Sequence, residues 1–449
     1  MSSTTRDDEY DPDISSTPPV VQPSRRTGGM FAALTVRNYR YYFAGQVVSN
    51  TGTWMQRIAQ DWLVLSLTGS SFAVGITIAM QFLPVLVFGL YGGVIADRFG
   101  KRRLLMLTQS AMGVLAAVLA ILTLTGSVHV WHVYLLAFLL GLVTAVDSPT
   151  RQTFVAEMVG QEQLRNAVSL NAANFETASM TGPAVAGAVI AAVGTGWAFA
   201  INAVSFIAVV GGLVLMRPEQ LRPVPRLARE KGQLRAGLHY VAARPELIGP
   251  LVLVGFVCTF GYNFPTVLSG FAYQVFHIDA ARYGLLNTAL AVGALVGALL
   301  ASRRPRVRMR LLVGTAFGFG VLEAVTAFAP RYWLFAAMLT VVGLLGLTFL
   351  TSSNATIQLA TEPTMRGRVM SLHMIVFIGG TPIGAPTIGW VTEAWGPRIG
   401  LLTCGAISAC AAAAVGWIIV RTNGLRVRVT RSGLTVAPCR NQAASSARA

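Results

Sequence analysis

Charge is scarce in this chain of 449 residues. Asp, Glu, Lys and Arg make up 12% of it, hydrophobic residues make up 54%, and the mean hydropathy is +0.59. Soluble globular domains contain roughly 45–50% apolar residues even when glycine is counted. The composition therefore excludes an ordinary soluble domain and indicates an integral membrane protein.

Several chemical motifs are also missing. No GxxxxGK(S/T) loop and no nucleophile elbow occurs, so neither ATP hydrolysis by this chain nor an enzyme is indicated. His129 and His132 lack the spacing of metal ligands. The cysteines have no CxxC spacing, which argues against a disulfide framework or a zinc site. They are Cys258, Cys404, Cys410 and Cys439. We expect no cofactor and no metal.

Long apolar runs are plentiful. Many are about 20 residues long, the length that an α-helix needs to cross a hydrocarbon core of roughly 30 Å. The period-two alternation of transmembrane strands is not seen. We predict an all-α integral membrane fold with twelve spans, near residues 42–66, 72–96, 104–124, 131–150, 166–192, 196–216, 248–270, 283–301, 311–328, 332–353, 369–391 and 399–420.

Positive charge outweighs negative charge, with a net charge of +17. If the N-terminus is cytoplasmic, nearly all Lys and Arg residues outside the spans fall in cytoplasmic loops and tails. The opposite side receives only Arg282, Arg331 and Arg398. This distribution follows the positive-inside rule and predicts a multi-pass protein of the cytoplasmic membrane with both termini inside. It accounts for the charge without nucleic-acid binding, although a basic tail can touch anionic lipid.

The chain contains an internal repeat. Residues 168–194 and 370–396 align without a gap, so that Gly182 falls on Gly384. Two six-helix halves follow from this repeat. Parallel halves around an axis along the membrane normal, with a site between them, are a transporter arrangement.

Composition divides the chain into five regions. The first region, residues 1–35, is polar, acidic and rich in Pro and Ser, which predicts disorder. Within the linker, residues 232–243 have apolar positions at helical spacing and predict an amphipathic helix on the inner membrane surface. The regions are a disordered cytoplasmic tail (1–35), an N-terminal six-helix half (36–216), a cytoplasmic linker (217–247), a C-terminal six-helix half (248–421) and a disordered basic tail (422–449).

One short segment, GGVIADRFGKRR at residues 92–103, is densely charged. Asp97 falls at the C-terminal end of the second span, where the helix dipole disfavours a carboxylate by about 0.3–1 kcal/mol. Gly100 permits a tight turn that brings the following bases back toward this helix end. The N-terminus of the eleventh span has free backbone N–H groups that favour an acid. This predicts a contact between Asp97 and that helix end which joins the two halves in one conformational state only. The bases are Arg98, Lys101, Arg102 and Arg103.

This segment resembles the signature loop of the major facilitator superfamily, with the pattern Gly93-x-x-x-Asp97-Arg98-x-Gly100-Lys101-Arg102. In that family the loop holds the inside-closed state. Other motifs resemble the branch that includes the enterobactin exporter and the transmembrane secretion effectors of bacteria. They are Asn38-Tyr39-Arg40, Gly45-Gln46, Trp54-Met55-Gln56-Arg57, Asp147-Ser148-Pro149-x-Arg151-Gln152, Asn166-Ala167 and Gly182-Pro183-Ala184-x-Ala186-Gly187.

The sequence departs from the pattern of the family in three places. Ala301 and Ser302 stand where the second half would repeat the Asp and Arg of the loop, and Ala186 replaces a glycine of the drug/proton antiporter motif. The fourth-helix Arg that is typical of proton antiporters would fall near Ala137. Its absence weakens the usual scheme of proton coupling.

The first span carries a polar stripe. Asn50, Trp54, Arg57 and Asp61 share one helical face. Because a charge inside a membrane costs at least ~2.5–3.5 kcal/mol, the stripe should face a cavity. We interpret Asp61 as the proton-carrying acid, Arg57 as its partner and Trp54 as a stacking surface for substrate. The alternative is a structural pair of Arg57 and Asp61 near the outer interface.

The fourth and fifth spans supply further candidates. Glu176 is a second proton-site candidate, with a hydrogen-bonded structural acid as the alternative. Asp147 and Arg151 make either an intrahelical pair, if the helix continues past Pro149, or the latch toward the signature loop that we favour. Asn171 and Asn174 share a face and are candidates for the substrate cavity. Gly182, Pro183 and Gly187 suit bending and close helix approach, as gating elements or as simple packing.

Polar groups of the second half complete the candidates. Tyr262 and Asn263 lie in the seventh span, and Ser352, Ser353 and Asn354 lie at the inner end of the tenth, on helices that line the cavity in this fold. They either bind substrate or hydrate the pathway. Glu323 lies in the ninth span, which resembles a peripheral helix of the fold.

We therefore predict a secondary transporter that works by alternating access between two six-helix halves. The resemblance implies an efflux antiporter that exports a small organic molecule, such as a drug, siderophore or secondary metabolite, in exchange for protons. The expected partners are the substrate, protons and the lipid bilayer, with no nucleic acid, and the chain is expected to be a monomer. The alternatives are an importer or facilitator of the same fold, and a non-transporting membrane receptor or assembly factor.

Overall fold

The computed structural model describes residue 29 and residues 31–222, 233–302, 309–422, 425–430 and 433–438. The first half contains η1 (Ala32–Thr35), α1 (Arg37–Thr68), α2 (Ser71–Arg98), α3 (Lys101–Leu124), α4 (Val130–Val193), α5 (Thr195–Val214) and η2 (Pro218–Gln220). After them come α6 (Gln233–Ala242), α7 (Pro245–Phe256), η3 (Val257–Gly261), α8 (Phe264–Gly270), η4 (Phe271–Val275), α9 (Ala280–Ser302) and α10 (Met309–Thr326). The last elements are α11 (Tyr332–Ala360), α12 (Arg366–Gly379), α13 (Thr381–Trp395), α14 (Pro397–Thr422), β1 (Leu425–Thr430) and β2 (Gly433–Pro438).

Among the described residues, 10 helical segments are long and apolar enough to cross a membrane. One of them, α4, contains two spans, because its backbone bends sharply at Gly160 (φ 70°, ψ 177°). The two spans of α4 are therefore separated at Gly160, within the connection that the sequence predicts between the fourth and fifth spans. Polar residues lower the hydropathy of α1, which is the remaining span. The fold is thus the predicted bundle of twelve transmembrane helices.

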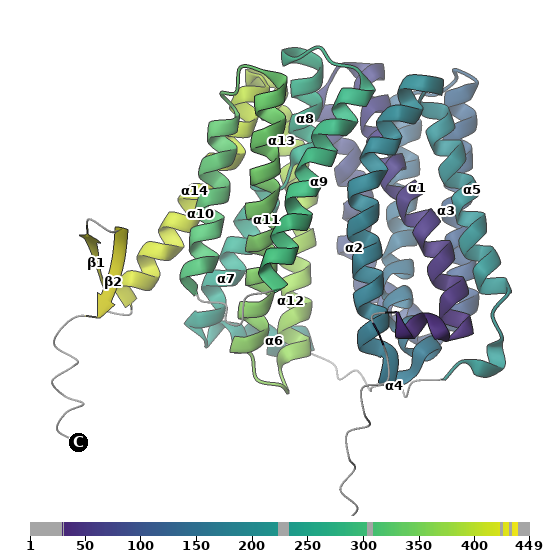
Figure 1. The fold of residues 1–449 in the computed structure, drawn as a ribbon, viewed down its shortest axis with the longest axis horizontal. Helices are drawn as coiled ribbons and strands as arrows, with labels where there is room; N and C mark the ends of the chain where they lie inside the picture. The colour runs from purple at the N-terminus through teal and green to yellow at the C-terminus, as the bar shows by residue number, and fades with distance from the viewer. Residues whose placement is uncertain are drawn as a thin grey trace, which may run out of the picture.

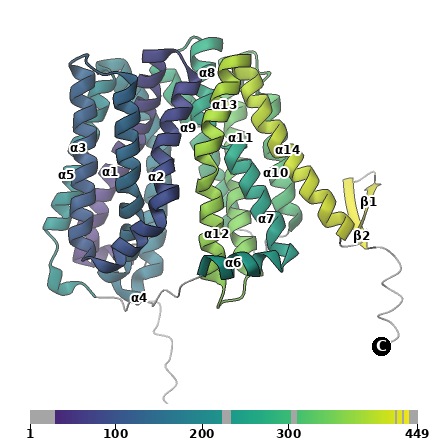
Figure 2. The same ribbon diagram turned by 180° about the vertical axis from the view of Figure 1, so that it is seen from behind.

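The twelve spans form two halves that lie side by side, α1–α5 and α7–α14 (Figure 1). We call the end of the bundle near η1 and α6 the linker end and the opposite end the distal end. α6 lies across the linker end of the second half, beside α12 (Figure 2). Its Gly237 approaches Arg368, so that a Cβ on this glycine would lie 3.4 Å from the Arg368 Cβ.

The internal repeat is visible in the packing between the halves. A Cβ on Gly187 would lie 3.0 Å from the Ala281 Cα, at the contact between α4 and α9. A Cβ on the equivalent Gly389 would lie 2.9 Å from the Ser71 carbonyl oxygen, at the contact between α13 and α2. Each half thus places a glycine of its repeated segment against the other half, as expected for pseudo-symmetric halves.

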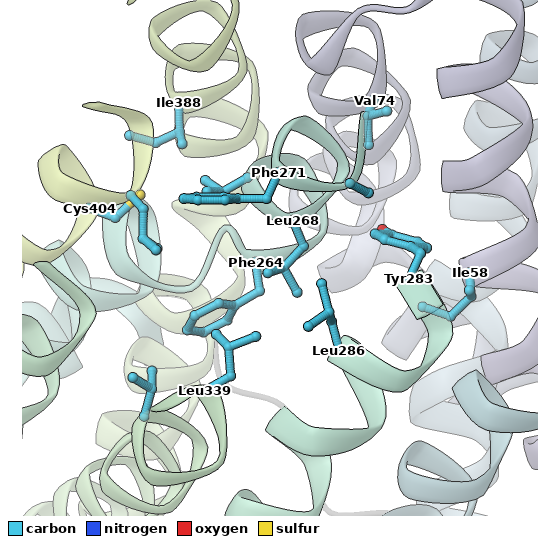
Figure 3. Packing of buried hydrophobic residues seen from close by; sticks show 14 of the residues in the cluster. Ile58, Val74, Phe264, Leu268, Phe271, Tyr283, Leu286, Leu339, Ile388 and Cys404 are labelled. Carbon is cyan, nitrogen blue, oxygen red and sulfur yellow. The ribbon is translucent and has the colours of Figure 1, made fainter. Parts of the chain in front are cut away.

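Close packing joins the halves near the distal end. The largest cluster of buried apolar residues contains Ile58 and Val74 of the first half together with Phe271 and Leu286 of the second (Figure 3). The rings of Trp62 and Tyr283 lie 5.7 Å apart across the same boundary. Because the cluster is continuous, the distal ends of the two halves form one hydrophobic unit in this conformation.

The region boundaries differ in detail from the predicted ones. α6 occupies the segment in which the sequence predicts an amphipathic helix. η1 begins inside the predicted N-terminal tail, and its Ala33 backbone N–H donates to Asn166 (2.9 Å). In the predicted C-terminal tail, β1 and β2 pair antiparallel, with Val427 opposite Val436. Alternating apolar and basic residues in β1 have the period of a strand, a pattern that the tail prediction did not use. The remaining tail residues lie outside the described ones.

Candidate functional site

A central cavity of about 400 Å³ lies between the two halves. Its walls come from α1, α2 and α4 on one side and from η3 and α8 to α13 on the other. Trp54, Tyr262 and Asn263, three of the predicted cavity residues, line it. Most of the lining is apolar, with polar groups at a few positions, which suits binding of an organic molecule. The sequence prediction missed the polar lining residues Gln60, Gln81 and Asn287.

A second cavity of about 300 Å³ lies within the first half, between α1, α2, α3, α4 and α5. We call it the lateral cavity. It adjoins the central cavity, because both share Trp54, Arg57, Gln60 and Gln81 in their walls. Asn50 lines the lateral cavity and Asp61 lines the central one. The polar stripe of α1 therefore lies in the walls of two adjoining cavities.

Arg57 stacks on an aromatic ring of its own helix. Its guanidinium carbon lies 4.7 Å from the centroid of the Trp54 ring. Within the described ranges, no ion pair joins Arg57 to Asp61 or to another carboxylate. The direct pair expected from the sequence, in either of its two interpretations, is thus absent in this conformation. Both charges nevertheless line the same central cavity.

The part of α4 after Gly160 presents a stripe toward the central cavity. Ser179 and Pro183 line that cavity, and Glu176 is half-buried one turn earlier on the same face. The two asparagines lie elsewhere. Asn171 accepts a hydrogen bond from the Tyr39 hydroxyl (3.1 Å), and Asn174 is buried with its amide nitrogen unpaired. Neither asparagine lines the two cavities.

Asp147 and Arg151 form an ion pair within α4, with an N–O distance of 2.5 Å. The helix continues past Pro149, so the structure forms the first of the two predicted arrangements and not the latch that we favoured. Asp147 also accepts from Thr108 and Gln109, each at 2.7 Å, and Arg151 donates to Gln46 at 2.8 Å. The pair therefore ties α4 to α3 and α1 within one half, beside the lateral cavity.

The signature loop is short, with only Phe99 and Gly100 between α2 and α3. Gly100 has φ −63° and ψ 114°, so this turn does not need the left-handed freedom of glycine that we expected. Gly93 is buried inside α2, Asp97 is half-buried and Arg98 is exposed at its end. The predicted contact of Asp97 with the eleventh span remains a prediction.

The bases of the loop bind within their own half. Lys101 forms an ion pair with Glu157 of α4. Arg102 donates to the carbonyl oxygens of Leu213 (2.7 Å) and Val214 (3.1 Å) at the C-terminal end of α5. Lys101 and Arg102 therefore do not make the expected return toward the end of α2. A cation at the C-terminus of α5 is favoured by the helix dipole there, and its N–H groups satisfy free carbonyls.

Gly182 and Gly187 of α4 allow neighbouring helices to approach closely and do not interrupt the helix. α4 stays helical through Gly182 and Pro183. A Cβ on Gly182 would lie 2.5 Å from the Trp54 Cβ, so this glycine lets α4 pack on the stacking residue of α1. The carbonyl of Pro183 would lie 2.5 Å from a Cβ on Gly284 of α9. Pro183 and Gly187 therefore belong to the packed contact between the halves.

The seventh span is interrupted beside the cavity. The π-helical turn η3 ends at Gly261, and the amide nitrogen of Asn263 donates to the carbonyls of Thr259 (2.7 Å) and Phe260 (3.1 Å). The ring of Tyr262 stacks on that of Phe319 with centroids 5.4 Å apart. π-Helical turns are frequent at functional sites. Ser353, by contrast, is enclosed in α11 with its hydroxyl unpaired and lines neither cavity.

One contact between the halves was missed by sequence reasoning. The Glu393 carboxylate, near the distal end of α13, accepts hydrogen bonds from the Ser70 hydroxyl and from the Phe72 backbone N–H (3.1 Å). Both donors lie at the first turn of α2, where backbone N–H groups are free and the helix dipole favours an anion. At the linker end, Arg244 binds Glu362, and this hydrogen bond raises the pKa of Arg244.

Two six-helix halves around a central cavity define a transporter of the major facilitator class. A family model described as "Transmembrane secretion effector" matches residues 28–431. The chain belongs to this family. Because the relatives in it are transporters, the family supports membrane transport rather than enzymatic activity.

Individual relatives are distant in sequence. The staphyloferrin A transporter of Staphylococcus aureus (strain NCTC 8325 / PS 47) is 24% identical over 80% of this chain and 90% of its own length. The enterobactin exporter EntS of Citrobacter koseri is 24% identical over 78% of this chain and 84% of its own length. A solved bacterial homologue of the human lysosomal transporter Spinster has a TM-score of 0.68 at 13% identity, over 86% of this chain and 97% of that one. This last likeness shows the fold.

Proposed function

We propose that this protein exports a small organic molecule across the cytoplasmic membrane by alternating access, in exchange for protons. The observation that carries the proposal is a cavity with walls from both halves and a buried acid, Asp61, in its lining. A molecule bound there contacts both halves, so its binding energy can depend on how they are arranged. Such a difference in affinity is what couples binding to a conformational change.

The direction and the substrate class rest on the relatives. EntS is named an exporter of enterobactin, and the Staphylococcus aureus relative is named a transporter of staphyloferrin A. We infer a siderophore or a similar secondary metabolite as cargo. The concentration of Lys and Arg at the linker end supports a cytoplasmic linker and cytoplasmic termini.

Two acids are our candidates for proton coupling. Asp61 lines the central cavity, and Glu176 lies on the cavity-facing stripe of α4. Buried carboxyl groups in membrane spans are costly when charged, so their protonation changes the energy of a conformation that exposes or encloses them. The signature loop and the distal contacts would act as gates on the two sides of the membrane.

The test uses inverted vesicles that contain the purified protein. An imposed inside-acid pH gradient should drive accumulation of at least one of a panel of siderophores and fluorescent amphipathic cations. Asp61→Asn or Glu176→Gln should abolish this gradient-driven uptake. Glu219→Gln is the matched control, because Glu219 is exposed at the linker end, outside both cavities.

Two other results have distinct meanings. Flux that ignores the gradient and both substitutions would indicate a facilitator and would remove Asp61 and Glu176 from the coupling scheme. Binding of panel members without net flux in either direction would contradict transport and favour a receptor.

A further inference from the structure

Arg57 is a cation whose hydrogen-bonding capacity is unused. Its Nε is buried without a hydrogen-bond partner, and its guanidinium contacts the Trp54 ring in the wall shared by the two cavities. In the part of the chain that the structure describes, no carboxylate forms an ion pair with it. Asp61 lies one turn further along α1 and lines the central cavity.

Arg151 is a cation with a structural role in this protein, and it differs from Arg57 in its bonding. It binds Asp147 through two nitrogens, at 2.5 and 3.1 Å, and donates to Gln46 at 2.8 Å. Arginine stays charged in proteins, and a buried cation without a counter-ion is strongly unfavourable. Asp61 attracts Arg57 electrostatically, but Arg57 has no hydrogen bond or ion pair within the described residues, so its N–H groups are available to a partner from outside the chain.

The surroundings of Arg57 indicate what that partner is. A guanidinium presents a planar fork of N–H groups that matches a carboxylate in a bidentate arrangement. On the central side, the cavity offers apolar and aromatic walls, including Phe264 and Phe319. On the lateral side, the amides of Gln60 and Gln81 border the same space.

We propose that Arg57 is the docking point for an acidic group of the substrate, and that the substrate is an amphipathic organic acid with its apolar or aromatic body in the central cavity. This proposal rests on the proposed function, because it assigns a substrate class to the same cavity. Trp54 holds the guanidinium in place by stacking, which leaves the edge of the fork for the acid. The role of Arg57 is then recognition of substrate charge rather than pairing with Asp61.

Equilibrium binding tests this proposal without a pH gradient or transport. The probes are radiolabelled 2-naphthoate and its neutral isostere 2-naphthamide, with the full-length protein in lipid nanodiscs. The unaltered protein should bind the acid more tightly than the amide. Arg57→Gln should weaken naphthoate binding by about ten- to a hundredfold, as expected for the loss of a charge-assisted hydrogen bond, and leave naphthamide binding unchanged.

Two further variants separate recognition from folding. Arg57→Lys keeps the charge but loses the fork, so it should restore part of the preference for the acid. Arg37→Gln is the matched control and should change neither affinity, because Arg37 stacks on Tyr41 of the same helix at 5.6 Å but lines neither cavity. Retained naphthamide binding shows that the cavity of each variant is intact.

The outcomes distinguish this proposal from the proposed function. No preference for the acid in the unaltered protein, including no binding of either probe, overturns the role of Arg57. Equal loss of both probes in Arg57→Gln does the same, because it shows a packing defect. Charge-selective binding that depends on Arg57, found in a protein that shows no flux, would retain this proposal and contradict only transport.

Discussion

The carboxylate of Glu393 accepts a hydrogen bond from the hydroxyl of Ser70, and the two residues belong to different halves of the protein. α2 runs from the distal end to the linker end, and α12 and α13 run in the opposite direction. Glu393 therefore stands at the C-terminal end of one helix and binds the N-terminal end of the other. Asp97 has the corresponding place at the linker end of α2, where the sequence predicts a contact with the start of the eleventh span.

Loss of the Glu393 carboxylate should open the distal contact. Hydrogen bonds to a charged group contribute about 1.5–3 kcal/mol, so Glu393→Ala should shift the ratio of distal-open to distal-closed protein roughly ten- to a hundredfold. The measurement is the rate at which a membrane-impermeant maleimide labels Cys258 from the distal side. The test uses a variant in which Cys404, Cys410 and Cys439 are replaced by serine, so that Cys258, which lines the central cavity, is the only cysteine left.

A matched control is available at the linker end. Glu362 also binds a neighbour through its carboxylate, but its partner Arg244 lies outside the contact between the halves. Glu362→Gln should therefore leave the labelling rate of Cys258 unchanged. Equal labelling of the Glu393→Ala variant and the unaltered chain would show that this carboxylate does not hold the distal end closed.

The bundle of two halves could be predicted from the sequence, because long apolar runs predict the membrane spans and the repeated glycines predict two equivalent halves. The contact of Glu393 could not be predicted in the same way. Ala191 stands at the aligned position of the first repeat, so the repeat itself carries no sign of this acid. Its partners also lie far away along the chain, and only the tertiary arrangement places a free helix N-terminus beside it.

The two Arg–Asp spacings show what helical spacing alone can predict. Asp147 precedes Arg151 by four residues, which is the favourable order for a pair on a helix, and these side chains form an ion pair. Arg57 precedes Asp61, which is the less favourable order. Helical side chains lean toward the N-terminus, so Arg57 reaches the Trp54 ring instead. Spacing identified the cavity face of α1 but not the pairing on it.

Gly75→Ala should prevent full closure of the distal end. A Cβ at this position would lie 2.4 Å from the Ala385 carbonyl oxygen, which belongs to the backbone of the opposite half and cannot move aside alone. The variant should fold, because the clash is relieved when the halves separate at the distal end. Spin labels at Leu67 and Trp395 should report a longer distance in pulsed electron spectroscopy.

Gly89→Ala provides the comparison within the same helix. Nothing lies within 4 Å of a Cβ at Gly89, and alanine is the better helix former by about 1 kcal/mol. This variant should keep the distance distribution of the unaltered chain. A Gly75→Ala variant with that same distribution would mean that α2 and α13 accommodate the methyl group without separation.

Breaking the pair of Asp147 and Arg151 should destabilise the first half. Asp147→Asn leaves a cation in a largely enclosed site and weakens the hydrogen bonds from Thr108 and Gln109. Removal of one partner of a buried pair costs about 3–5 kcal/mol, and the Arg151 side chain, which is 32% exposed, places the loss near the lower value. The thermal unfolding temperature in detergent should fall by several degrees.

The double variant Asp147→Asn, Arg151→Gln separates the charge effect from the loss of shape. Because the double variant has no unpaired cation at position 151, it should be more stable than Asp147→Asn alone. The losses of stability at the two positions are then less than additive, which gives a positive coupling energy between them. Arg244→Gln removes a more exposed ion pair and should change the unfolding temperature little, because solvent screens such pairs. Additive losses at Asp147 and Arg151 would show that hydrogen bonds to α3 and α1, rather than the ion pair, stabilise this part of the bundle.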